Sequence, residues 1–251
     1  MNKISAVILA KNEENMIADC IESVSFCDEI IVIDNDSNDM TADIAKSMNA
    51  KVYLVNELSF AFLRNFGLSK VKNEWILYVD ADERVSTILR ESILNIIKVA
   101  DKTIAGYRLK RKNYYFGKNE WPQIEKLERL FVKKYLKNWR GELHETPEVD
   151  GQIKNIDEGF LLHYTHRDLT SMLKKTIEWS RIEAKLRFDS HHPKVTWWRI
   201  PRVMLTAFYN SYINQKGYKA GTVGIIESTY QAFSMFVTYA RLWEMQQKRN
   251  H

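Results

Sequence analysis

Four largely apolar runs alternate with four segments of helical periodicity in the first hundred residues, and this alternation restricts the fold more than any other feature. The apolar runs are Ile4–Ala10, Glu29–Asp34, Lys51–Val55 and Trp75–Asp80. The helical segments that follow them are Asn15–Val24, Thr41–Met48, Ala61–Val71 and Thr87–Val99. Strands that alternate with helices form a mainly parallel sheet covered by helices on both faces. The predicted class is therefore α/β.

The pattern changes twice farther along the 251-residue chain. From Gly106 to Tyr164 it is irregular and aromatic, which favours short strands and loops. From Arg167 onward it is helical, with a break at His191–Pro193. We therefore predict two parts, residues 1–165 with the sheet and residues 166–251 with a helical region.

Cysteine content and hydropathy indicate a cytosolic setting. Cys20 and Cys27 fit no zinc pattern, and two cysteines in a chain of this length are typical of a reducing compartment. The N-terminal apolar stretch is too short for a secretory signal. No apolar run approaches the roughly 20 residues that a membrane-spanning helix needs. We expect a cytoplasmic protein without a membrane span.

Polar clusters follow three of the predicted strands, where each strand ends. They are Lys11-Asn12-Glu13-Glu14, Asp34-Asn35-Asp36-Ser37 and Asp80-Ala81-Asp82-Glu83. Open α/β sheets bind ligands beyond the carboxyl ends of their strands. The first glycine is Gly67, which excludes a glycine-rich phosphate loop in the first two strand–helix turns. A nucleotide bound here needs another partner for its phosphates, and a metal ion is the obvious one.

Asp80 and Asp82 are the candidate metal ligands. In an extended segment, residues two apart point to the same side, so both carboxylates would converge while Ala81 and Glu83 point away. Carboxylate oxygens suit Mg²⁺ or Mn²⁺. The alternative is an ordinary solvated loop. Turn chemistry and helix capping by Asp39 or Thr41 could likewise explain the cluster after the second strand.

Three stretches together carry a family resemblance: the first strand with its Lys-Asn-Glu-Glu, IIVIDNDSNDMTADIA, and RNFGLSKVKNEWILYVDADE. In this order they resemble glycosyltransferase family 2, which implies a GT-A fold. Family members carry Asp-Asp-Gly-Ser where this chain has Asp34, Asn35, Asp36 and Ser37. The resemblance implies that the following residues contact the nucleotide-sugar donor: Ala10, Asn12, Glu13, Asp34, Asp36, Ser37, Arg64, Asn65, Asp80, Ala81, Asp82 and Arg129. A solvated helix position for Arg64 and a surface ion pair for Arg129 are the alternatives.

Later stretches extend the resemblance over nearly the whole chain. RKNYYFGK, ERLFVKK, WRGELHETPEVDG, LLHYTHRDLTSMLKKTIEWSRIEA and YINQKGYKAGTVGIIES are similar to the bacterial inner-core glucosyltransferases of lipopolysaccharide and lipooligosaccharide. This resemblance implies an inverting transfer of a hexose, with UDP-glucose as the expected donor, onto a lipid-linked heptose oligosaccharide. The alternatives are another sugar or a peptide acceptor, or a non-enzymatic α/β protein that binds nucleic acid or a membrane.

An inverting transfer needs a base for the acceptor hydroxyl, and the resemblance assigns this role to Glu145. Glu142 is the fallback, and His144 could orient its neighbour. The alternative for this region is an irregular polar loop without a function. His163, at the end of a predicted strand, matches a late histidine that many GT-A enzymes bring to the metal. A structural histidine is the alternative for His163.

Two segments are basic and aromatic. Residues 102–119 contain no acid and mix six basic residues with Tyr107, Tyr114, Tyr115 and Phe116. Residues 190–226 also lack acids, and their five basic residues equal the net charge of the whole chain, +5. Such segments suit a phosphate-bearing acceptor and the cytoplasmic face of the inner membrane. The alternatives for the first segment are single-stranded nucleic acid and a solvated edge hairpin. The alternative for the second is a helical subdomain that touches no lipid. We expect no nucleic-acid partner.

Overall fold

The computed structural model describes residues 2–99, 101, 103–141 and 145–248. The chain divides into two compact units. The first comprises Met1–Lys112 and Ile124–His163, and the second comprises Asn113–Gln123 and Tyr164–His251. The sequence places a boundary at residue 165, close to the break at residue 163. It does not anticipate that residues 113–123 belong to the second unit.

The first four strands begin and end close to the limits that the apolar runs predict. The strands are β1 Ile4–Ala10, β2 Glu29–Asp34, β3 Lys51–Leu54, β4 Trp75–Asp80, β5 Glu83–Val85, β6 Ile104–Tyr115, β7 Asn119–Val132, β8 Leu136–Arg140, β9 Thr146–Val149, β10 Gln152–Asn155 and β11 Leu161–Tyr164. Among the described residues, nine strands form one sheet in the order β3-β2-β1-β4-β7-β6-β11-β5, with β10 paired to β6. Strands β8 and β9 form a separate antiparallel pair.

The first four strands are parallel, which confirms the predicted α/β class. The region after Gly106 departs from the expectation of short strands, because β6 and β7 are 12 and 14 residues long. Their lengths could not be read from periodicity, since both strands carry charged residues on their partly exposed positions.

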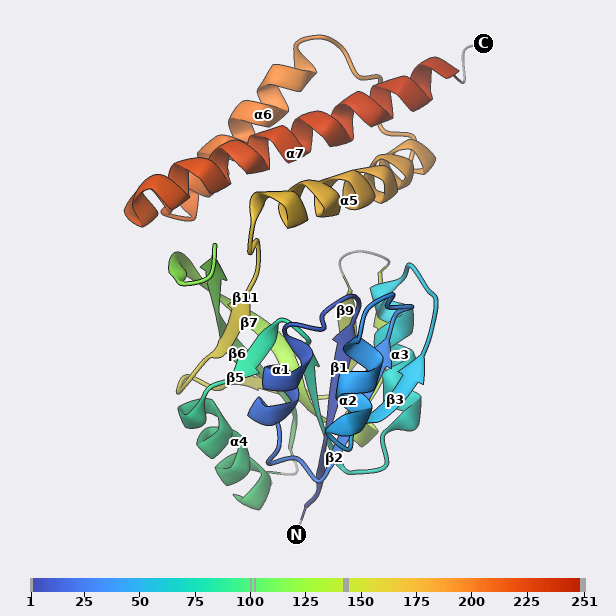
Figure 1. Ribbon diagram of the computed structural model, residues 1–251, viewed down its shortest axis with the longest axis vertical. Coiled ribbons are helices and arrows are strands. Elements are labelled where there is room, and N and C mark those ends of the chain that lie inside the picture. Colours follow the sequence, from blue (N-terminus) through green and yellow to red (C-terminus); the bar gives the residue numbers. More distant parts are fainter. Residues whose placement is uncertain (1, 100, 102, 142–144, 249–251) are drawn as a thin grey trace. The chain divides into compact units, whose positions relative to one another are not determined.

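Helices cover both faces of the parallel strands (Figure 1). The helices of the first unit are α1 Ile17–Ser23, α2 Thr41–Ser47, α3 Phe60–Lys70 and α4 Thr87–Val99. Alternate residues of β1 separate two cores: Ile4, Ala6 and Ile8 pack with α1, α2 and α4, whereas Val7 and Leu9 pack with α3 and β8. Gly67 lets α3 approach closely, since a Cβ there would lie 2.5 Å from Val7 Cγ1.

The second unit is mainly helical. It contains α5 Leu169–Asp189, α6 Arg199–Tyr209, a π-helical turn at Asn210–Asn214, a 3₁₀ turn at Gly217–Ala220 and α7 Gly221–Lys248. Both α5 and α6 pack along α7. The break predicted at His191–Pro193 is confirmed between α5 and α6. Among the described residues, no helix combines the length and the hydropathy required to cross a membrane.

Candidate functional site

The carboxyl ends of β1, β2 and β4 meet at one edge of the sheet, as the alternating pattern predicts. Ala10 is aligned with Asp34 across the β1–β2 pair, and Leu9 is aligned with Asp80 across the β1–β4 pair. The three polar clusters of the sequence therefore start side by side. This is the position at which open α/β sheets bind nucleotides.

The loops after β1 and β2 interlock through the residues predicted to contact a donor. The Asn12 backbone N–H donates to Ser37 Oγ at 2.9 Å, and Asn12 Oδ1 accepts from the Asn38 N–H at 2.8 Å. The Glu13 N–H donates to Thr41 Oγ1 at 2.8 Å. Asn12 and Asp36 both take positive φ angles, of 53° and 57°. These contacts join the two loops into one rim at the edge of the sheet.

One carboxylate oxygen of Asp34, which lies next to this rim, is able to accept a further hydrogen bond. The carboxylate is fully buried, and its Oδ1 accepts from the Ser37 N–H at 2.8 Å. Its Oδ2 has no hydrogen-bond partner among the described residues. Buried carboxylate oxygens are nearly always paired, so an unpaired one marks a place where a ligand donor is expected.

The residues that follow Asp34 hold the loop after β3. The Asn35 side chain donates to the Glu57 carbonyl and accepts from the Glu57 N–H, both at 2.9 Å. Asp36 Oδ2 accepts from Asn56 Nδ2 at 3.0 Å. The amide at position 35 thus has a structural use that an aspartate, which lacks a donor, could not fill. Asp39 accepts from the Thr41 N–H at 3.0 Å, which is the turn chemistry considered for this cluster. The N-cap of α2 is Met40 and has no side-chain cap hydrogen bond among the described residues, so helix capping by Asp39 or Thr41 is wrong.

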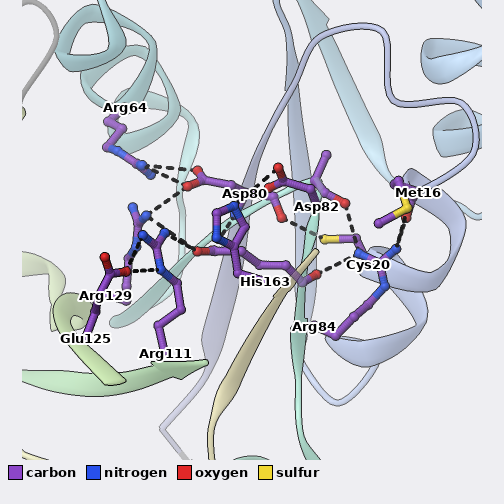
Figure 2. Close-up of polar contacts among 12 residues, drawn as sticks. Met16, Cys20, Arg64, Asp80, Asp82, Arg84, Arg111, Glu125, Arg129 and His163 are labelled. Atoms are coloured by element: carbon purple, nitrogen blue, oxygen red, sulfur yellow. Dashed lines mark hydrogen bonds and ion pairs between the residues drawn. The ribbon is translucent and has the colours of Figure 1, made fainter. Parts of the chain in front are cut away.

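Asp80, at the end of β4, is held by two arginines (Figure 2). Arg64 Nη2 lies 3.1 Å from Oδ1, and Arg129 Nη2 lies 2.8 Å from Oδ2. Burial raises the pKa of the Asp80 carboxyl, but Arg129 and Arg64 outweigh burial and hold that pKa well below its usual range. Asp80 is therefore ionised at neutral pH, and both of its oxygens already have cationic partners.

Arg64 links Asp80 to Glu145. Only 2% of its side chain is exposed, which excludes the solvated helix position considered for it. Its Nε and Nη2 both contact Glu145 Oε1, at 2.9 and 2.8 Å. Its guanidinium also lies over the Trp139 ring, 5.0 Å from the centroid. Arg129 is likewise buried, so a surface ion pair is excluded for it.

Asn65, the residue after Arg64 and also predicted to contact the donor, fixes the strand that leads to Glu145. Its Nδ2 donates to the Trp139 carbonyl at 2.9 Å, and its Oδ1 accepts from the Trp139 N–H at 2.7 Å. This double contact ties α3 to β8. Both polar atoms of the Asn65 side-chain amide are therefore hydrogen-bonded to the backbone of Trp139.

The extended geometry assumed for residues 80–83 is wrong, because Ala81 and Asp82 form a turn between β4 and β5. As a consequence Glu83, which the alternation places away from the site, turns back into it. Glu83 Oε2 accepts from the Asp80 N–H at 2.9 Å. Its Oε1 lies 3.0 Å from Arg111 Nη1 and 3.8 Å from Arg129 Nη2.

Arg111 and Glu83 are the site residues that sequence reasoning missed. Arg111 contacts both Glu83 and Glu125, the latter at 2.6 Å. Within the sequence Arg111 is one of several basic residues of an acid-free segment, so nothing distinguishes it from its neighbours. Glu83 is completely buried, and the sequence does not reveal this position, because alternation along an extended segment places Glu83 on the side away from the site.

Asp82 lies beside His163 of β11, where His163 Nε2 is 3.4 Å from Asp82 Oδ2. A carboxylate oxygen and an imidazole nitrogen are donors that suit Mn²⁺ and, for the oxygen, Mg²⁺. The pair thus fits two ligands of a divalent cation, whereas Asp80 faces arginines. Among the described residues, no three His, Cys, Asp or Glu side chains are assembled as a metal site.

Two further predicted residues pack at the edge of the sheet. Ala81 is buried in the core, and its N–H donates to the Leu9 carbonyl at 2.9 Å. The Ala10 carbonyl accepts from the Asn35 N–H at 2.8 Å. Glu142 and His144, the alternative base and its neighbour, lie outside the described residues.

Comparisons with known proteins agree with this arrangement. Residues 5–160, more than half of the chain, match the family described as Glycosyl transferase family 2. An uncharacterized glycosyltransferase of Rickettsia typhi is 30% identical over 262 residues, covering 99% of this chain and 89% of the relative. The lipopolysaccharide core biosynthesis glycosyltransferase LpsC of Rhizobium meliloti is 26% identical, covering 96% of this chain and 92% of the relative.

A solved structure shares the fold. Residues 1–349 of TarS from S. aureus, in complex with UDP-GlcNAc, superpose with a TM-score of 0.53 at 13% identity. The superposition covers 99% of this chain and 92% of that chain. At this identity the likeness concerns the fold alone.

Proposed function

The chain belongs to glycosyltransferase family 2, and from this premise we propose that it is an inverting, metal-dependent hexosyltransferase of lipopolysaccharide core assembly. The observation that carries the proposal is the cluster of Asp80, Asp82, Arg64, Arg129 and Glu145 at the carboxyl edge of the sheet. A transferase needs groups that hold a diphosphate leaving group and a carboxylate that accepts a proton. The cluster contains both. Family membership sets aside the non-enzymatic alternative.

The donor is a nucleotide sugar, with UDP-glucose as the expected one. The unpaired Oδ2 of Asp34 can accept a hydrogen bond from an N–H group of the base. The rim formed by Asn12, Asp36 and Ser37 holds the loops around that carboxylate. The TarS structure contains UDP-GlcNAc, which supports a uridine nucleotide as the class of donor.

A divalent cation, Mg²⁺ or Mn²⁺, would be held by Asp82 and His163, with donor phosphate oxygens and water as further ligands. When bound, it supplies positive charge to the departing diphosphate. Asp80 has a different role in this proposal: it holds Arg64 and Arg129 in place. These two guanidinium groups can then contact the diphosphate, because each uses only part of its donor set on carboxylates.

Glu145 is the proposed base. Both contacts from Arg64 fall on Glu145 Oε1, so among the described residues Arg64 orients the carboxylate and leaves Oε2 for a substrate. The acceptor hydroxyl oxygen attacks the anomeric carbon and its proton passes to Glu145. The bond between the anomeric carbon and the phosphate oxygen breaks, and the configuration inverts.

The acceptor is a lipid-linked inner-core oligosaccharide at the cytoplasmic face of the bacterial inner membrane. LpsC, a relative over nearly the whole chain, acts in lipopolysaccharide core biosynthesis according to its name. The acid-free segment 190–226 supports a peripheral position on an anionic membrane. Another sugar or a peptide acceptor is the alternative within the family.

A panel of nucleotide sugars tests the proposal, with UDP release measured with and without Mg²⁺ or Mn²⁺. We expect UDP release from UDP-glucose that depends on the metal and increases with an inner-core acceptor. Release that is unchanged in excess chelator would refute the metal dependence, and release from a different nucleotide sugar alone would reassign the donor.

A further inference from the structure

An exposed, mainly apolar stripe begins at Trp198, the N-cap residue of α6, and runs along that helix in the helical unit. Trp198, Arg202, Leu205 and Tyr209 are spaced by four, three and four residues, which places them on one face of a helix. All four are exposed, and Leu205 is 70% exposed. Ile213 continues the stripe into the π-helical turn and is also exposed. We refer to these five residues as the α6 stripe.

The opposite face of α6 is the one that holds the helix in the unit. Val203 is buried and Ile200 is partly buried, and both pack with Val195, Tyr239 and Leu242. Internal packing therefore accounts for the apolar residues on that face. It does not account for the α6 stripe, which contributes nothing to that core.

Aromatic and basic groups lie together around the stripe. Trp197, just before α6, is 84% exposed. The guanidinium of Arg202 lies 5.4 Å from the centroid of the Trp198 ring. Lys194, Lys216 and Lys219 lie in the same acid-free segment, and none of these cations forms an ion pair with a carboxylate in the part of the chain that the structure describes.

We propose that the α6 stripe, with Trp197, is the surface by which the protein lies on an anionic lipid bilayer. This inference rests on the proposed function for its biological setting, since a lipid-linked acceptor requires the enzyme to work at a membrane. The helix lies in the interface: the stripe enters the boundary between headgroups and acyl chains, and the cations contact lipid phosphates. Tryptophan and tyrosine are enriched at this depth of a bilayer.

The chemistry of the surface distinguishes a bilayer from two other occupants. A second copy of this chain, docked symmetrically, would place the acid-free segment against itself and bring like charges together. Nucleic acid would contact the cations and stack on the aromatic rings, but it would not bury the exposed aliphatic side chains of Leu205 and Ile213. Hydrocarbon takes up aliphatic and aromatic side chains alike.

Sedimentation with vesicles tests the surface in the full-length protein. The probes are vesicles of phosphatidylcholine alone and vesicles that contain phosphatidylglycerol, both at low salt. We expect wild-type protein to sediment with the anionic vesicles only. Trp197→Ser with Leu205→Ser should lower the partition coefficient at least about tenfold, because two large apolar groups are removed from the interface. Lys194→Glu with Arg202→Glu should lower it by a similar factor.

A matched control comes from the first unit. Ile88→Ser removes an apolar residue of α4 that is also exposed, and we expect this variant to sediment like the wild type. Lipids brominated on their acyl chains should quench tryptophan fluorescence in the wild type, and Trp197→Phe with Trp198→Phe should remove most of that quenching. These two readouts separate insertion from simple electrostatic adsorption.

Three results would overturn the proposal: no sedimentation of the wild type with anionic vesicles, wild-type sedimentation of both stripe variants, or a dimer in solution that the stripe variants abolish. UDP release from the donor in vesicle-free buffer is measured on every variant. Vesicle binding without UDP release would refute the proposed function and leave the membrane surface standing. UDP release without vesicle binding would refute the membrane surface and leave the proposed function standing.

Discussion

Two arginine-containing regions of this chain use their charges in opposite ways. At the carboxyl edge of the sheet, Arg64, Arg111 and Arg129 each contact at least one carboxylate within 3.1 Å. Between residues 190 and 226, the cations have no carboxylate partner among the described residues, and apolar side chains lie exposed beside them. Paired and buried charges fix a geometry, whereas unpaired charges at a surface remain able to attract an external partner.

The largest effect should come from Asp82→Ala in the paired region. Removing the carboxylate beside His163 eliminates one of the two proposed metal ligands, so UDP release should fall roughly 10³-fold, since several kcal/mol of charge stabilisation is lost. The assay is UDP release with Mn²⁺, with circular dichroism to verify the fold. Asp43→Ala, on the exposed side of α2, is the control. Full activity of Asp82→Ala in excess chelator would contradict the metal assignment.

Glu145→Gln should come next. The amide keeps the size of the side chain but cannot accept the proton of the acceptor hydroxyl, so kcat should fall about 10²-fold or more. Donor binding should change much less, because the proposed base contacts the acceptor. Calorimetric titration with UDP, alongside steady-state kinetics, separates the two quantities. Equal losses in donor affinity and kcat would show that Glu145 acts mainly by holding Arg64.

Two substitutions that change a charge, one in each region, compare how much each region contributes to the free energy of unfolding. Glu83→Gln leaves Arg111 and Arg129 with fewer partners in a buried place, and we expect the free energy of unfolding to fall by about 2–3 kcal/mol. Arg202→Glu reverses a charge on the exposed α6 stripe and should change it by less than about 0.5 kcal/mol. Urea unfolding measures both. Similar losses in the two variants would remove the distinction between the regions.

Ionic strength should produce the smallest and most selective effect. Screening reaches about 3 Å at 1 M salt and about 10 Å at 0.1 M, and buried pairs are screened much less than exposed charges. Raising NaCl from 50 to 500 mM should therefore weaken binding to anionic vesicles several-fold while the free energy of unfolding changes by less than about 1 kcal/mol. Vesicle binding that resists salt would mean that the apolar residues of the α6 stripe alone carry the interaction.

The first half of the fold could be predicted because its signals are local. Ile4–Ala10, Glu29–Asp34 and Trp75–Asp80 are strands within the predicted limits, since a buried parallel strand needs an uninterrupted apolar run. The site edge followed from the same reasoning, because parallel strands bring Asp34 and Asp80 to one side. The long strands β6 and β7 were not predicted, since their charged residues obscure the alternation.

What the sequence determined by itself is the class of fold, the sheet edge at which the acids collect, and the segment that holds the excess positive charge. These follow from periodicity and composition, which are properties of neighbouring residues. Only the tertiary structure decided how the charges pair. The turn at Ala81 and Asp82 reverses the direction of Glu83, and Arg64, Arg111 and Arg129 reach the site from α3, β6 and β7. Ion pairs between residues up to 81 positions apart depend on how strands and helices pack, and no local pattern encodes that packing.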